Sequence, residues 1–303
     1  MSVVKSLSKR FKYYWSEKNP VFLTRLMFLV NFRKILNLSK PRDINEKLHY
    51  LKLYVYNDNP LITRCVDKYR VKEYLSEKNI DGLHVANNYS HIMKSGEEIR
   101  GIWDSLPDSF VVKCNHGCGF NILVKDKNKE NIDSIVNTID EWLLDEQWKM
   151  YCEPQYKNVD KGCFIEEYLG DDVEAYKFYC FNGKPEVVYV SSKGDTGIQD
   201  YYLDYYDKNW NWLDINLDGH GNLGPVANKP ELYDEMLRIA RALALEFPFV
   251  RVDLYEVGGR VYFSELTFVP TGGNMKLKPR YVVDEWGKML DLSVTNMGIG
   301  QTY

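Results

Sequence analysis

The stretch "RVDLYEVGGRVYFSELTF", residues 251–268, decides the fold, because it is patterned as two strands joined by a pair of glycines. Polar and apolar residues alternate on both sides of the glycines, which is typical of strands with one buried face. Arg251 and Asp253 share a face of the first strand. Glu265 and Thr267 share a face of the second. The pattern predicts a hairpin with its charged side chains on one face.

The register of this hairpin determines whether its carboxylates meet. A two-residue turn at the glycines would place Asp253 opposite Ser264, and a slip of one residue turns every side chain to the other face. A three-residue loop over residues 258–260 would pair Asp253 with Glu265 and gather the apolar residues on the other side. The hydrophobic pattern therefore predicts the three-residue loop.

Two facing carboxylates repel each other unless a cation lies between them. Magnesium suits such a pair, because it is usually held by one or two carboxylates together with substrate phosphates. The alternative is a surface hairpin whose polar face is simply wet. The sequence leaves both interpretations open.

A second stretch, "KCNHGCGFN" (113–121), has three interpretations. Zinc would use Cys114, His116 and Cys118, but this spacing suits one tetrahedral ion poorly and no fourth ligand is near in sequence. Thiol catalysis would need a base and an orienting group beside one cysteine. The third interpretation is a loop that closes over phosphate.

The flanks of this stretch favour the phosphate loop. Two short β segments, "FVVK" (110–113) and "NILVK" (121–125), enclose it. Gly117 and Gly119 would let backbone N–H groups approach an anion, and Lys113 would supply charge. It resembles the glycine-rich turn that covers ATP phosphates in kinases, and it is not a P-loop. The alternative is a merely structural hairpin.

The composition sets wider bounds. The chain has 303 residues, 45% hydrophobic and 27% charged, which is ordinary for a globular protein. A formal net charge of −4 argues against nucleic acid as a partner. The six cysteines include no CxxC pair, and a chain of this length needs no disulfides. We expect reduced cysteines and a cytoplasmic protein.

The remaining periodicity predicts an α+β fold with antiparallel sheets. Helices are expected at 43–56, 60–79, 131–146 and 231–247, and residues 1–57 are mostly helical. Strands are expected at 164–169 and, beyond residue 200, in the tyrosine-rich segment. Residues 176–193 are expected to form a hairpin that turns at Asn182-Gly183.

The N-terminus combines lysines and arginines with an apolar run, "VFLTRLMFLV" (21–30). The run is too short and too charged to span a bilayer, and no secretory cleavage pattern follows it. It could rest on an anionic membrane surface. The favoured alternative is a helix packed on the body of the protein.

Several motifs in order resemble those of the TupA-like (teichuronopeptide-biosynthesis-like) family of ATP-grasp enzymes. They are "INEKLHYLKLY" (44–54), "NPLITRCVDKYRVKEYL" (59–75), "LPDSFVVKCNHGCGFNILVKD" (106–126), "FIEEYL" (164–169), "YKFYCFNGKP" (176–185) and "FPFVRVDLYEVGGRVYFSELTF" (247–268). The resemblance implies two α+β subdomains that enclose a nucleotide cleft after a helical N-terminal region. The expected division is 1–65 helical, 66–168 central and lid subdomain, and 169–303 C-terminal subdomain with the metal hairpin.

The resemblance also implies residue roles. ATP contacts would come from Lys68, Lys113, Gly117, Gly119 and Lys177, with Glu166, Glu167 and Leu169 at the adenine hinge. Mg²⁺ would be held by Asp253, Glu265 and Thr267, and Arg251 and Lys113 would act in catalysis by stabilising transferred charge. Thr267 departs from the family pattern, which has Asn there. The ribose acid would be Asp172 or Glu174, and "PTGGN" (270–274) would shape the acceptor site.

The implied activity is an ATP- and Mg²⁺-dependent ligase that joins a carboxylate to an amine through an acyl phosphate and releases ADP. The family context suggests an amino acid joined to a uronic acid in a cell-surface polysaccharide or capsule, at the inner face of the membrane. Two alternatives remain: a phosphotransferase acting on a sugar hydroxyl, and a non-catalytic nucleotide-binding module in glycan assembly.

Overall fold

The computed structural model describes residues 3–171, 173–193, 201–225 and 227–294. The chain forms two compact units, and each is built from separate parts of the sequence. The first comprises the chain up to Thr24, Tyr56–Tyr74 and Val85–Asp171. The second comprises Arg25–Val55, Leu75–His84 and the chain after Asp171. The three-part division at residues 65 and 168 stays a prediction.

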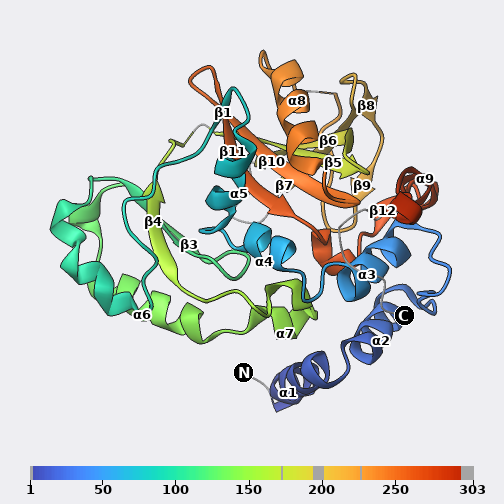
Figure 1. Ribbon diagram of the computed structural model, residues 1–303, viewed down its shortest axis with the longest axis horizontal. Coiled ribbons are helices and arrows are strands. Elements are labelled where there is room, and N and C mark those ends of the chain that lie inside the picture. The colour runs from blue at the N-terminus through green and yellow to red at the C-terminus, as the bar shows by residue number, and fades with distance from the viewer. Residues whose placement is uncertain (1–2, 172, 194–200, 226, 295–303) are drawn as a thin grey trace. The chain divides into compact units, whose positions relative to one another are not determined.

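The second unit is built on a large sheet whose described strands run in the order β1-β11-β10-β5-β6-β7-β8 (Figure 1). Neighbouring strands are antiparallel except β1 and β11, which are parallel. The bounds are β1 Leu83–His84, β5 Glu174–Phe181, β6 Lys184–Lys193, β7 Tyr201–Asp207, β8 Trp212–Leu213, β10 Phe249–Val257 and β11 Arg260–Thr267. A small pair is formed by β9 (Asn216–Leu217) and β12 (Leu277–Lys278). The expected antiparallel α+β fold is confirmed.

The β10–β11 hairpin pairs Asp253 with Glu265, but the predicted three-residue loop is wrong. Val257 pairs with Arg260, so the turn contains only the two glycines, whose φ angles of 56° and 69° suit a tight hairpin turn. A β-bulge between Asp253 and Leu254 then restores the carboxylate pairing. The extra residue, Ser264 on β11, shifts the register by one, and the spacing of the buried residues Val261, Phe263 and Leu266 changes there from two to three.

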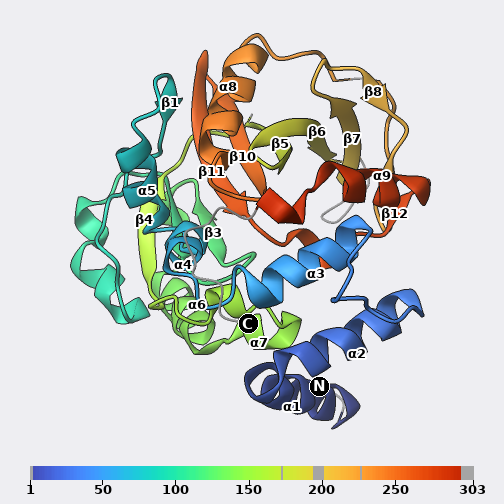
Figure 2. The ribbon, with the colours of Figure 1, turned by 45° about the vertical axis from the view of Figure 1, so that its right-hand side comes forward.

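Helices cover both faces of this sheet. The apolar side of α8 (Tyr233–Ala244) packs against β5, β6 and β10 (Figure 2). On the opposite face, Trp286 of α9 (Tyr281–Met289) contacts the rings of Tyr179, Phe181 and Tyr205. α3 (Ile44–Tyr54) packs against α9. The expected turn at Asn182-Gly183 is confirmed, since Phe181 and Lys184 flank it as a pair.

The first unit contains a three-stranded antiparallel sheet in the order β3-β2-β4. The bounds are β2 Phe110–Cys114, β3 Asn121–Val124 and β4 Cys163–Glu167. The amphipathic helix α6 (Ile132–Leu144) covers this sheet with Ile135, Val136 and Ile139. β2 and β3 therefore present the stretch 115–120 as a loop between two paired strands, as predicted.

The N-terminal part is helical, as expected, with α1 (Val3–Lys18) followed directly by α2 (Pro20–Phe32). α7 (Gln147–Tyr151) packs against α1 within the first unit. The predicted single helix over 60–79 is wrong: it is split into α4 (Pro60–Val66) and α5 (Val71–Lys78). The carboxylate of Asp67 causes the break, because it accepts the backbone N–H groups of Tyr69 and Arg70 at 2.9 and 3.0 Å. No helix in the described ranges is both long and apolar enough to cross a bilayer.

Candidate functional site

In the first unit, two lysines converge on one buried carboxylate. Lys72 of α5 lies 2.8 Å from one oxygen of Glu166 on β4, and Lys113 of β2 contacts the other oxygen. Lys72 also donates to the carbonyl of Ala86 at 2.6 Å. Burial lowers the pKa of Lys72, against the opposing pull of Glu166. The cluster holds two ammonium groups for one carboxylate, so its excess positive charge suits an anion.

A third lysine, Lys68 in the segment between α4 and α5, contacts the loop that follows β2. The ammonium of Lys68 donates to the backbone carbonyl of Gly117. Asn115 anchors the base of the loop: its amide donates to Asp67 at 2.9 Å and accepts from the N–H of Gly162 at 2.9 Å. At Gly117 an added Cβ would lie 2.6 Å from the Phe120 ring, so glycine is required there by packing. The loop is held in place from three sides.

Cys114 at the end of β2 and His116 in the loop are chemically quiet. Burial raises the pKa of the Cys114 thiol to about 12, which keeps it protonated and a poor nucleophile. Burial also lowers the pKa of His116 to about 4, so the imidazole is neutral and its Nε2 donates to the Trp142 carbonyl at 3.0 Å. Neither group supports the thiol-catalysis interpretation.

The end of β4 holds the residues expected at the adenine hinge. One oxygen of Glu167 accepts from the backbone N–H and the side-chain amide of Asn87, at 3.0 and 2.7 Å. Leu169 follows the strand and is half-buried. Of the two ribose candidates, Glu174 accepts the Tyr176 hydroxyl at 2.6 Å, and Asp172 lies outside the described residues. Their roles stay predictions.

In the second unit, four residues of the hairpin form a single polar cluster on one face of the sheet. The guanidinium of Arg251 donates from Nε to Asp253 at 2.7 Å and from Nη2 to the other oxygen of Asp253 at 2.7 Å. The same Nη2 lies 2.8 Å from Glu265 and 3.0 Å from the hydroxyl of Thr267. Lys177 on β5 reaches Asp253 at 3.2 Å. The structure thus brings these predicted residues together.

The charges of this hairpin cluster are balanced. Two carboxylates face two cations, and Asp253 is only 1% exposed. Burial works to lower the pKa of Arg251, but the carboxylates of Asp253 and Glu265 outweigh it and hold that pKa well above its usual range. The guanidinium therefore stays charged. The Arg251–Asp253 pair is stabilised by its two direct hydrogen bonds rather than by water.

The oxygens of the hairpin cluster fit a cation. Those of Asp253, Glu265 and Thr267 all lie within 3.0 Å of one point, the Nη2 atom of Arg251, which stands where a positive charge is favoured. Carboxylate and hydroxyl oxygens are hard ligands of the kind Mg²⁺ takes. In the described parts of the chain, no three His, Cys, Asp or Glu side chains gather as a ready metal cluster. The third ligand here would be the threonine hydroxyl.

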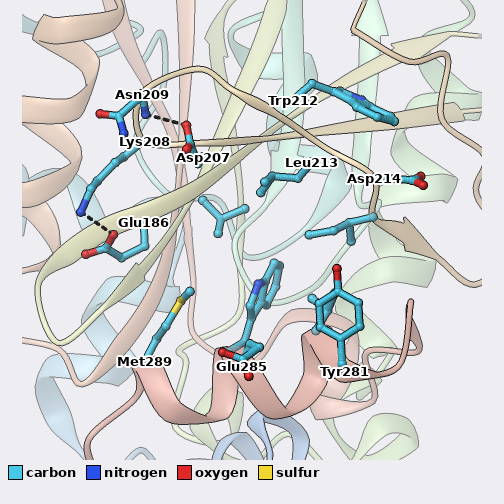
Figure 3. A pocket seen from close by; sticks show the side chains of 14 residues that line it. Glu186, Asp207, Lys208, Asn209, Trp212, Leu213, Asp214, Tyr281, Glu285 and Met289 are labelled. Carbon is cyan, nitrogen blue, oxygen red and sulfur yellow. Dashed lines mark hydrogen bonds and ion pairs between the residues drawn. The ribbon is translucent and has the colours of Figure 1, made fainter.

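A groove of about 400 Å³ opens further along the same sheet face (Figure 3). Arg251, Tyr179, Val187 and Asp207 are successive register partners, and Val187 lines the groove, so the groove begins two strands, or about 10 Å, from the hairpin cluster. Its lining combines the aromatic residues Trp212, Tyr281 and Trp286, the acidic residues Glu186, Asp207, Asp214 and Glu285, and Lys208. Such an acidic lining disfavours a phosphate-bearing ligand.

Two residues of the site were missed by sequence reasoning. Lys72 lies in the same motif as Lys68, four residues later, but the choice between two lysines on adjacent turns depends on the break at Asp67. Asn115 was left without a role, although it is buried and anchors the loop. The only sequence signal for Asn115 was its position close to the glycines of the loop. Its hydrogen-bond partners, Asp67 and Gly162, are distant in the sequence.

These features define an α+β protein with a lysine-rich glycine loop on one antiparallel sheet and an arginine–carboxylate cluster on another. A family model described as TupA-like ATPgrasp matches residues 46–290, and the chain belongs to this family. The resemblance drawn from the motifs is thereby confirmed. No curated protein matches the chain at a significant level.

Solved structures of a synthase and two ligases show weaker similarity. N5-carboxyaminoimidazole synthase from Aspergillus clavatus aligns with a TM-score of 0.41 and 10% identity, over 68% of this chain and 44% of that chain. D-alanine–D-alanine ligase from Helicobacter pylori has a TM-score of 0.40 and 18% identity, over 82% and 67%. D-alanine–D-alanine ligase from Bacillus anthracis has a TM-score of 0.38 and 19% identity, over 68% of this chain and 57% of that chain. The chain spans about half the length of the Aspergillus and Bacillus proteins, so the family assignment rests on the sequence match.

Proposed function

We propose that this protein is an ATP- and Mg²⁺-dependent ligase that joins a carboxylate to an amine and releases ADP. The observation that carries the proposal is the convergence of Asp253, Glu265 and Thr267 on one cationic point, the Nη2 atom of Arg251. Membership of the ATP-grasp family supports it. The excess positive charge around Glu166 supports it further, because a triphosphate needs such a partner.

Each cluster has a part in this proposal. Asp253, Glu265 and Thr267 would hold Mg²⁺, which supplies charge neutralisation at the phosphates. Arg251 and Lys177 would stabilise negative charge on the transferred phosphoryl group. Lys113, Lys72 and the loop around Lys68 would bind phosphate oxygens, with Glu167 and Leu169 beside the adenine.

The proposed chemistry is balanced in two steps. An oxygen of the substrate carboxylate attacks the terminal phosphorus of ATP, the bond to the ADP oxygen breaks, and an acyl phosphate forms. The amine nitrogen then attacks the acyl carbon, inorganic phosphate leaves with its bonding electrons, and the nitrogen gives up a proton to solvent. Buried cations such as Arg251 lower the cost of both steps by facing the developing charge.

The substrate proposal is an amino acid joined to a uronic acid of a cell-surface polysaccharide, in line with the family resemblance. A cytoplasmic location is part of this proposal. It is supported by the six cysteines, which all lie in the described ranges and form no disulfide with one another. The loop 270–274, which follows the metal hairpin, would border the acceptor.

An ADP-release screen of uronic acids against amino acids tests the proposal. The expected result is ADP release that needs both substrates, and hydroxylamine in place of the amine should trap a hydroxamate from the acyl phosphate. Asp253→Asn is the matched control and should lose activity by at least 100-fold, while an active Asp253→Asn enzyme would refute the metal assignment. A phosphorylated sugar with no amine consumed would establish the phosphotransferase instead. ATP binding with no ADP released from any pair would establish the non-catalytic module.

A further inference from the structure

We propose that α2 and the residues just after it form a docking surface for an anionic phospholipid bilayer. One face of α2 packs inward through Leu23, Thr24 and Phe28, all buried. The packed-helix interpretation therefore holds for that face. The other face is exposed, and its chemistry is unlike that of an ordinary solvent-facing helix.

The exposed face alternates apolar and cationic residues at helical spacing. Phe22, Arg25 and Leu29 follow one another at intervals of three and four residues, and Arg33 continues the series just beyond the helix end. We define the docking surface as these four residues together with Val30 and Ile35. A helix that faced only water would carry polar residues there.

The apolar members are well exposed. The exposed fractions are 45% for Leu29, 71% for Val30 and 81% for Ile35. Single exposed hydrophobic residues are normal on a protein surface. A run of them interleaved with arginines is instead the pattern of helices that lie in a membrane interface, with apolar side chains among the acyl chains and cations at the headgroups.

The charge distribution of the chain identifies the bilayer as anionic. Residues 1–42 contain ten lysines and arginines and a single acidic residue, Glu17. The remaining residues contain 29 lysines and arginines and 42 acidic residues, although the whole chain has a net charge of only −4. Each cation near an anionic membrane contributes about 1 kcal/mol. An anionic surface thus attracts the N-terminal arm and repels the rest, which orients the protein.

The apolar residues favour a bilayer over nucleic acid. A phosphate backbone would be bound by the cations alone, and Leu29, Val30 and Ile35 would have no counterpart on it. The interface of a bilayer offers anionic headgroups to the arginines and acyl chains to the apolar side chains beside them. The proposal does not rest on the ligase reaction, although an enzyme acting on membrane-linked glycan precursors would gain substrate by residing at the inner leaflet.

Co-sedimentation with lipid vesicles tests the proposal. The full chain should bind vesicles of phosphatidylcholine with 30% phosphatidylglycerol at least tenfold more tightly than pure phosphatidylcholine vesicles, and high salt should weaken the binding. Val30→Ser with Ile35→Ser should reduce binding about tenfold, and Arg25→Glu with Arg33→Glu should reduce it further. ADP release in solution should be unchanged in both variants, because none of these residues contributes to the proposed site.

Two matched control variants distinguish binding through this surface from nonspecific adsorption of the protein to vesicles. Leu245→Ser removes an exposed leucine of similar accessibility, 72%, from the end of α8. Arg260→Glu makes at the exposed hairpin turn the charge change that each of the two arginine substitutions makes. Both should bind vesicles like the parent. No binding to anionic vesicles, equal losses in the controls, or binding to duplex DNA that vesicles do not compete with would each overturn the proposal.

Discussion

The two charged clusters differ in how their charges are balanced. Around Glu166, two lysines share one carboxylate, and a third lysine contacts the loop nearby. Around Asp253, two carboxylates face an arginine and a lysine. The first cluster has positive charge left over, and the second is neutral as it stands.

This difference suggests complementary tasks. A cluster with spare positive charge is stabilised when it binds an anion, and it needs to break few existing contacts to do so. A neutral cluster that contains the bidentate Arg251–Asp253 pair is already satisfied, so a metal ion can bind there only as the Arg251 guanidinium gives up oxygens to it. The comparison therefore predicts that the second cluster contributes more to stability, and the first more to nucleotide affinity.

The largest effect is expected from Asp253→Asn on stability. It leaves Arg251 and Lys177 with only Glu265 between them, and breaking a buried ion pair costs about 3–5 kcal/mol. Urea unfolding measures the loss. Glu265→Gln is the control, because its side chain is 38% exposed and the change should cost less than about 1 kcal/mol. Equal losses of unfolding free energy in the two variants would show that the buried and the exposed carboxylate contribute alike to stability.

The sequence predicted which residue pairs with Asp253, but it did not predict the two-residue turn and the bulge that produce this pairing. Alternation placed Asp253 opposite Glu265 correctly, because the apolar face of the hairpin had to be buried. It did not predict the bulge near Leu254, because a three-residue loop without a bulge gives the same pairing of Asp253 with Glu265. The break at Asp67 was missed for a similar reason: helical periodicity continues through a cap that acts by hydrogen bonds. Choosing Lys72 over Lys68 needed that break.

A buried neutral histidine makes the first unit sensitive to acid. The pKa of His116 is about 4 in the folded chain and near 6.5 when unfolded, so the unfolded chain binds more protons between these values. Stability is fully present above pH 6.5 and is lost as the pH falls toward 4, by roughly 3 kcal/mol. His116→Gln keeps a donor for the Trp142 carbonyl and should flatten this slope in urea unfolding at a series of pH values.

His49 gives the corresponding test in the second unit. Burial lowers its pKa well below the usual value, so His49→Gln should also reduce acid sensitivity. If both units unfold together, the two variants should act additively on the slope. An unchanged pH slope in His116→Gln would mean that the imidazole of the loop is hydrated and titrates normally.

Nucleotide affinity should separate the lysines of the first unit. Lys72→Ala removes one of the two cations at Glu166 and should weaken ATP binding about tenfold, or about 1.4 kcal/mol. Lys68→Ala should have a smaller effect, because that ammonium contacts the Gly117 carbonyl and is not one of the two cations that converge on Glu166. Binding of a fluorescent ATP analogue measures both. Lys125→Ala, an exposed lysine paired with Asp171, is the control. A larger loss in Lys68→Ala would restore the assignment drawn from the sequence.

The smallest effect is expected at the tip of the loop. Gly119 has a φ of 77° and no atom within 4 Å of an added Cβ, so Gly119→Ala meets only backbone strain, about 1 kcal/mol. Gly101 is equally open but has no positive φ, so Gly101→Ala should cost nothing measurable. Thermal unfolding compares the two. If Gly119→Ala also raised the concentration of ATP needed for half-saturation while Gly101→Ala did not, the loop conformation itself, and not only its lysines, would be part of the anion site.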